Sequence, residues 1–217
     1  KGAFNTGSYS GSKYHLEIMC DEEGDSTMNY FILSQDERIL HAVEPIGITQ
    51  TIKKEWLTRE RMAELESIDR QFPILDKSEQ DYVDFISRPI ALLSDSLKQL
   101  VEKYNPRMPF KPLVLVDMPK LKQTLYWLVI PPKVACLSSQ TEFHLDGTVK
   151  KLVIDEALAR PYTFFKINGI KEDFIFVNIE LAESMLRRSF RGLRLVNVQT
   201  EGQWHDLFVN LSRINGQ

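Results

Sequence analysis

Apolar residues recur along this chain with two different spacings, which separate extended segments from helical ones. Met28 to Leu33 is a short apolar and aromatic run between polar residues, as expected of a buried strand. Residues 54–70 are mostly charged and carry apolar side chains near helical spacing, which predicts a short amphipathic helix.

The clearest helical signal lies at residues 94–104, where the apolar side chains share one face. Ser94 can cap the start of this helix by accepting a hydrogen bond from an unpaired backbone N–H. Pro106 follows its end and stops it. A second helix is predicted at residues 180–190, and Gly192 stands where a left-handed residue can close it.

Strands dominate from Phe110 onward. We expect them at residues 113–116, 124–130, 151–154, 192–198 and 204–211. A hairpin is predicted at residues 164–177 and a tight turn at Asp146-Gly147. In the first half of the chain, a strand is also expected at residues 14–20. Trp127 lies inside an apolar strand and is expected in the core. Because helices do not alternate regularly with these strands, we predict an α+β fold: a mixed, mostly antiparallel sheet with a few packed helices.

The chain has 217 residues, which suits one generous domain or two small ones. The first twelve residues are rich in Gly and Ser, and Met28 resembles a natural start, so residues 1–27 are an N-terminal extension or supply a first strand. Residues 28–217 are predicted to form a single α+β domain. Its part at 28–109 mixes strands and helices, and its part at 110–217 is rich in strands.

Cysteine content and the length of the apolar runs indicate a cytoplasmic protein. Cys20 and Cys136 are far apart and form no CxxC pair. Each is expected to be a small buried hydrophobe, and one bridge between them remains open. The apolar runs are far shorter than the ~20 residues of a membrane-spanning helix, and residues 1–8 lack a signal-peptide core. We therefore expect no membrane partner.

The formal charge of −3 is distributed unevenly. Residues 1–110 hold 13 Lys and Arg against 19 Asp and Glu, whereas residues 111–217 hold 14 against 11. No strongly basic face is indicated, so nucleic acid is not an expected partner. The acidic half either complements a basic protein or is an ordinary solvated surface.

No motif for catalysis or cofactor binding is present. The chain has no phosphate loop, no dinucleotide fingerprint, no HExxH and no EF-hand spacing. His144 precedes Asp146 by two residues, a spacing that can orient a catalytic base, but Gly147 favours a solvated turn there. We therefore predict no enzymatic activity, no cofactor and no metal site.

Two charged clusters remain. Glu79, Asp81 and Asp84 lie in a proline-bounded segment, where an exposed loop is favoured over a catalytic carboxylate pair. Four arginines lie within residues 187–194, at the end of the second predicted helix. Cations there complement the helix dipole, which is favoured over phosphate binding.

Residues 164–198 carry a family resemblance. They read Phe-Phe-Lys-Ile-x-Gly-Ile, then Phe-Ile-Phe-Val-Asn, then Leu-Ala-Glu-Ser-Met-Leu-Arg-Arg-Ser-Phe-Arg-Gly-Leu-Arg-Leu-Val-Asn-Val. This resembles the C-terminal signature of an immunity-protein family of bacterial polymorphic toxin systems, formerly a domain of unknown function. Met28 to Leu33 resembles the typical opening of that family, and residues 1–27 depart from it.

The resemblance implies a non-enzymatic protein that binds and neutralises a cognate toxin without a cofactor. If the toxin is a basic nuclease, charge complementarity points to the acidic first half of the chain. The residues expected to bind the partner are Glu22, Glu23, Asp25, Glu79, Asp81 and Asp84. Two alternatives stay open: an interaction or scaffolding module with another partner, and an enzyme whose site joins His144 or His205 to carboxylates distant in sequence.

Overall fold

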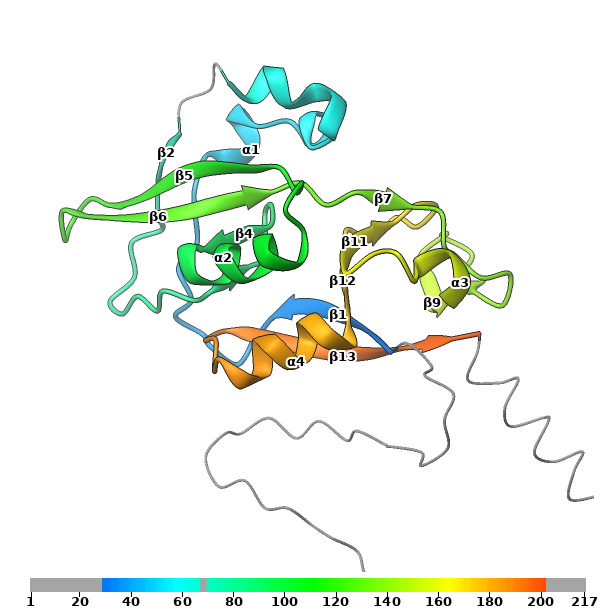
Figure 1. The fold of residues 1–217 in the computed structure, drawn as a ribbon. Coiled ribbons are helices and arrows are strands. Elements are labelled where there is room, and N and C mark those ends of the chain that lie inside the picture. Colours follow the sequence, from blue (N-terminus) through cyan, green and yellow to red (C-terminus); the bar gives the residue numbers. More distant parts are fainter. Residues whose placement is uncertain (1–28, 67–69, 202–217) are drawn as a thin grey trace, which may run out of the picture.

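A computed structural model describes residues 29–66 and 70–201 of the chain (Figure 1). The strands expected at residues 14–20 and 204–211 lie outside these ranges, as does Cys20. The predicted α+β class is confirmed, because two mixed sheets of mostly antiparallel strands pack with a few short helices. Three strand pairs are parallel, namely β10–β13, β11–β7 and β2–β5.

The larger sheet has six strands in the order β10-β13-β1-β12-β11-β7. Their bounds are β1 Tyr30–Gln35, β7 Lys133–Val134, β10 Val153–Ile154, β11 Phe164–Ile167, β12 Ile175–Asn178 and β13 Leu193–Thr200. The first strand lies near the centre, paired antiparallel with β12 and β13. The predicted hairpin of residues 164–177 is confirmed as the antiparallel pair β11–β12.

The smaller sheet has five strands in the order β2-β5-β6-β4-β3, and β8 and β9 form a separate pair. Their bounds are β2 Gln71–Pro73, β3 Phe85–Ile86, β4 Leu92–Ser94, β5 Phe110–Asp117, β6 Lys122–Val129, β8 Glu142–Phe143 and β9 Val149–Lys151. The long hairpin β5–β6 keeps one register from Phe110↔Val129 to Asp117↔Lys122. In Figure 1 this hairpin extends beyond the other strands of its sheet.

Helices cover the sheets. Their bounds are α1 Ile48–Thr51, α2 Asp95–Tyr104, α3 Glu156–Ala159 and α4 Ile179–Arg187, with 3₁₀ helices η1 Lys54–Trp56 and η2 Arg59–Leu65. The predicted cap of α2 is confirmed, since the Ser94 hydroxyl oxygen accepts a hydrogen bond from the Leu97 N–H at 3.2 Å. Within the described ranges, no helix is long and apolar enough to cross a membrane.

The single helix predicted at residues 54–70 is wrong. Two short 3₁₀ helices stand there, separated by the extended residue Thr58, and the second contains a non-helical Arg61. The apolar residues Leu57 and Met62 are five positions apart, which exceeds the three or four that one face of an α-helix allows. Breaking the helix lets both side chains pack against the same core.

The exit from α4 also differs from the expectation. The helix ends at Arg187, and the left-handed residue that follows it is Ser189, with φ of 51°. Gly192 has φ of 77° but lies later, in the turn before β13. A Cβ atom at Gly192 would lie only 2.4 Å from Cγ1 of Val83, so the glycine allows two chain segments to approach each other closely.

Three hydrophobic cores hold the layers together. The first lies between helices α2 and α4 and one face of both sheets, and it includes Phe31, Phe85, Leu97, Phe164 and Met185. The second lies on the opposite face of the five-stranded sheet, and the third on the opposite face of the six-stranded sheet. Because the first core draws on both sheets, it joins the early and late parts of the chain.

Trp127 is not a core residue, contrary to the prediction. Its neighbours Tyr126 and Leu128 face the second core and are almost fully buried, so the alternation of β6 turns the indole toward the N-terminus of α2. There the half-buried indole N–H donates to the Asp95 carboxylate at 2.9 Å. The Lys98 ammonium lies 4.8 Å from the ring centroid.

Candidate functional site

A groove of about 1080 Å³ opens between the two sheets. Three stretches of chain supply most of its lining: the end of β1 with the loop after it, residues 85–91 around β3, and residues 172–175 at the start of β12. Thr49, Lys54 and Lys77 supply the rest. Buried side chains line its inner surface, among them Leu33, Phe85, Ile86 and Ile175. Both sheets therefore contribute to one concave surface with an apolar interior.

Hydrogen bonds hold the walls of this groove in place. The Gln35 side-chain oxygen, at the end of β1, accepts a bond from the Ser87 backbone N–H at 3.1 Å and so links the two sheets. Backbone bonds tie residues 41–46 to a second segment, with Val43 N–H to Asp81 carbonyl at 2.9 Å and Leu75 N–H to Glu44 carbonyl at 2.8 Å. The wall formed by residues 41–46 is therefore fixed by hydrogen bonds, although it contains little regular sheet.

Charges of both signs surround the groove. The Lys77 ammonium donates to the Ala42 carbonyl at 3.1 Å and pairs with Glu44 at 3.3 Å, so it belongs to the wall. Glu37, Lys54 and Arg88 also line the groove and are exposed. Within the described ranges these three side chains make no ion pair, so they can contact a ligand without breaking one.

Large aliphatic side chains stand exposed on the same wall. Leu40 lines the groove with 78% of its surface accessible. Ile46 and Leu75, at 43% and 40%, are also exposed and lie on the two segments that the backbone bonds pair, outside the lining of the groove. A group of exposed aliphatic residues beside a concave surface is typical of an interaction site.

The strongest pKa shifts occur in the cores and not at the groove. Burial raises the pKa of Tyr30 to about 12 and that of the Cys136 thiol to about 11. Cys136 is a free, fully buried thiol, and a raised pKa keeps it in the unreactive protonated form at neutral pH. Among the described residues, no three His, Cys, Asp or Glu side chains are grouped to hold a metal ion.

The acidic residues predicted to bind a partner have different positions. Glu22, Glu23 and Asp25 lie outside the described ranges. Glu79 is exposed, with its carboxylate 3.8 Å from the His41 imidazole.

Asp81 and Asp84 meet at Arg191. The Arg191 guanidinium lies 2.5 Å from the Asp81 carboxylate, and its backbone N–H donates to the Asp84 carboxylate at 2.6 Å. The Ser94 hydroxyl donates to the other Asp84 oxygen at 2.5 Å. Both carboxylates thus have partners within the chain, and binding of a toxin by these residues stays a prediction.

The other charged motifs have local roles. The Arg188 guanidinium donates to the Ser184 carbonyl in the last turn of α4 at 2.9 Å, which supports the helix-dipole interpretation of the arginines. The solvated turn at Asp146-Gly147 is confirmed. The Asp146 carboxylate accepts bonds from the Thr148 N–H and hydroxyl, and Gly147 has φ of 79°.

The sequence analysis did not identify the groove residues. Leu40 and Arg88 occur in segments without a periodic pattern, and an exposed leucine cannot be told from a buried one by its letter alone. In comparisons with known proteins, no protein-family model and no curated protein matches the chain.

Proposed function

We propose that this chain is an immunity protein that binds a cognate bacterial toxin and neutralises it, and that the inter-sheet groove receives a segment of the toxin. The observation that carries the proposal is the groove itself, of about 1080 Å³ with Leu40 exposed at its rim. Small-molecule sites are usually enclosed clefts of roughly 300–1,000 Å³. An open groove above this range is better suited to a loop or strand of another protein.

The composition of the rim supports a protein partner. Interfaces combine an apolar centre, which supplies most of the binding energy, with a polar surround that excludes water. The buried apolar side chains inside the groove supply such a centre, and Leu40, Glu37 and Arg88 belong to the surround.

The family resemblance is consistent with this position of the site. Its residues, 164–198, form β11, β12, α4 and β13, and they supply Phe174 and Ile175 to the groove. The remaining signature residues build the six-stranded sheet and its helix. The wall that contains Leu40 comes from outside the signature. This suits a family whose members share a framework but bind different toxins.

A protection assay tests the proposal. The toxin gene that the proposal expects beside this chain's gene is expressed in a bacterial host together with the wild-type chain, with Leu40→Asp, or with Leu158→Asp. Leu158 is a matched control, an exposed leucine on α3 that does not line the groove. We expect the wild type and the control to restore growth and Leu40→Asp to fail, with at least a roughly tenfold loss of toxin affinity.

Two results would contradict the proposal at different levels. If the wild type neither protects nor binds the toxin, the immunity function is wrong. If Leu40→Asp protects as well as Leu158→Asp, the function stands but the groove is not the binding surface.

A further inference from the structure

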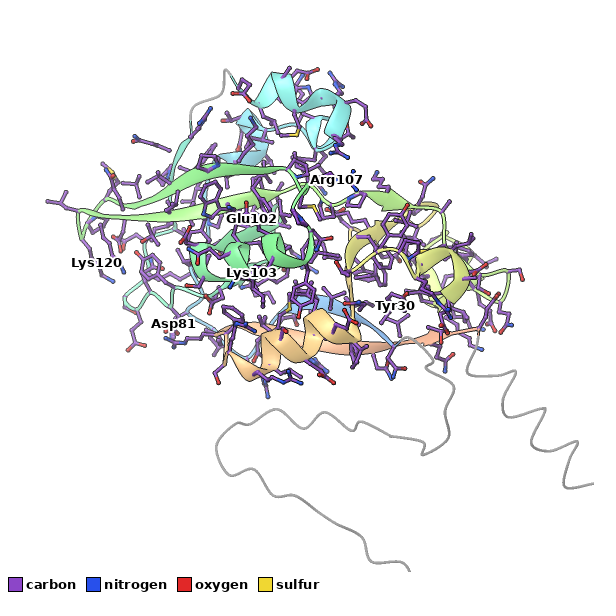
Figure 2. All side chains as sticks on the ribbon, in the orientation of Figure 1. Tyr30, Asp81, Glu102, Lys103, Arg107 and Lys120 are labelled. Carbon is purple, nitrogen blue, oxygen red and sulfur yellow. The ribbon has the colours of Figure 1, made fainter. Side chains whose placement is uncertain are left out.

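The turn that closes the β5–β6 hairpin carries two large apolar side chains in water. Met118 is 64% exposed and Leu121 is 89% exposed. Figure 2 labels Lys120 of the same turn, at the free end of the hairpin. The turn therefore projects an apolar tip away from the three cores.

The leucine at this tip is also in an unfavourable backbone conformation. Leu121 has φ of 50°, in the left-handed region that glycine and asparagine occupy at low cost. A branched side chain there crowds its own backbone. Neither burial nor backbone preference explains a leucine at position 121, and such strain is typically retained where a side chain has a function.

The turn is held rigid by the residues beneath it. The Asp117 carboxylate is 3% exposed and accepts a bond from the Lys120 N–H at 3.1 Å. The Tyr82 hydroxyl donates to the other Asp117 oxygen at 3.4 Å, and the Lys122 ammonium lies 3.6 Å from the Tyr82 ring centroid. Rigid presentation lowers the entropy lost when a tip docks into a partner.

The net charge at the tip is positive. The Asp117 carboxylate is covered and lies 3.9 Å from the Lys120 ammonium, whose side chain is 51% exposed, and Lys122 is exposed as a second cation. The accessible surface of residues 117–122 thus combines two cations with two apolar side chains. Its complement is a cleft with an apolar floor and a rim of carboxylates.

We propose that this hairpin tip is a second contact with the toxin and inserts Met118 and Leu121 into an acidic cleft of that protein. The inference rests on the proposed function for the identity of the partner. A toxin that cleaves nucleic acid with a metal ion carries both a basic surface and an acidic cleft, because cations bind phosphates and carboxylates bind metals. The tip of a rigid hairpin would block such a cleft.

The test compares two exposed leucines at hairpin turns. Leu121→Gly removes the apolar side chain and also relieves the backbone strain, so it is expected to raise the urea midpoint while weakening affinity for the purified toxin at least about tenfold. Leu145→Gly is the control, since Leu145 is fully exposed in the turn between β8 and β9. It is expected to leave toxin affinity unchanged. A purely structural role for Leu121 cannot produce higher stability together with weaker binding.

Charge is tested separately. Replacing Lys120 and Lys122 with glutamine should slow association with the toxin and reduce its salt dependence. Equal toxin affinity of wild type and Leu121→Gly would overturn the inference and leave the proposed function intact. A wild type that does not bind the toxin would overturn both.

A membrane surface is the other possible target of a basic apolar tip. Sedimentation with phosphatidylserine vesicles distinguishes it. If the wild type sediments with the vesicles and Leu121→Gly does not, while both bind the toxin equally, the tip is a lipid contact and the inference is wrong.

Discussion

Replacing Asp84 is expected to reduce the stability of the fold, because its carboxylate is bonded within the chain. This carboxylate joins two distant parts of the chain, the cap of α2 through Ser94 and the turn before β13 through Arg191. The backbone of the same residue adds two bonds, from its N–H to the Arg191 carbonyl and from the Ser94 N–H to its carbonyl. Asp84→Ala keeps the backbone bonds and removes both side-chain bonds.

The two bonds are unequal, which sets the expected magnitude. The contact with Ser94 is partly buried and 2.5 Å long, so a charge-assisted bond there contributes about 1.5–3 kcal/mol. The contact with Arg191 is exposed, where water can replace the lost acceptor and the loss falls below about 1 kcal/mol. We expect Asp84→Ala to lower the free energy of unfolding by about 2–3 kcal/mol.

Urea unfolding followed by tryptophan fluorescence measures this loss. Ser94→Ala is the partner variant, and it should cost about 1 kcal/mol for the cap in addition to the shared bond. The double variant should show a coupling of about 1–2 kcal/mol, because the two changes remove one bond between them. Near-wild-type stability of Asp84→Ala with lost toxin binding would refute this reasoning and favour a direct contact with the partner.

Three further predictions follow from burial and backbone conformation, and the first two use the same unfolding assay. Gly192→Ala should lower the free energy of unfolding by about 2–4 kcal/mol, from left-handed backbone strain and from steric overlap of the new Cβ. Gly47 has φ of 81° and nothing within 4 Å of an added Cβ, so Gly47→Ala should lower it by only about 1–2 kcal/mol. Equal losses in the two variants would contradict the close approach of two chain segments at Gly192. Tyr30→Phe removes a buried hydroxyl that has no hydrogen-bond partner among the described residues, so stability should stay level or rise by up to about 1 kcal/mol. Burial raises the pKa of Tyr30 from 10.0 to about 12, so the unfolded chain ionises first and wild-type stability should fall between these pH values more than that of the variant. In a Cys20→Ser variant, Cys136 should react with a thiol reagent only as the protein unfolds, and rapid labelling of the folded protein would argue against its burial.

Local patterns predicted the elements whose stability is local. Helix α2 runs from Asp95 to Tyr104, inside the predicted range, because its cap, its apolar face and the following proline all act within a few residues. The turn at Gly147 and the hairpin β11–β12 also depend on short-range chemistry. The prediction of a single helix at residues 54–70 was wrong, because the spacing of its apolar residues fits an α-helix only loosely.

The groove depends on pairings that no local pattern contains. Residues 41–46 join a segment about thirty positions later through backbone bonds, and Gln35 reaches Ser87 across the gap between sheets. Backbone groups carry no side-chain signature, so these pairings cannot be inferred from residue types alone. The position of Leu40 on the rim follows from them.

Composition directed attention to the acidic residues, whose contact with a partner stays a prediction. Acidic residues were selected because charge can be counted in a sequence, yet the carboxylates of Asp81 and Asp84 are occupied by Arg191 and Ser94. Leu121 would be taken for a buried strand residue, although the structure exposes it at a strained turn. The two kinds of variant separate these roles. Asp84→Ala should lose stability while its folded fraction still binds, and Leu121→Gly should gain stability while it loses binding. Binding sites often contain residues that lower the stability of the folded state, through a strained backbone or an exposed apolar side chain. Such residues can be recognised only when their backbone conformation and exposure are known.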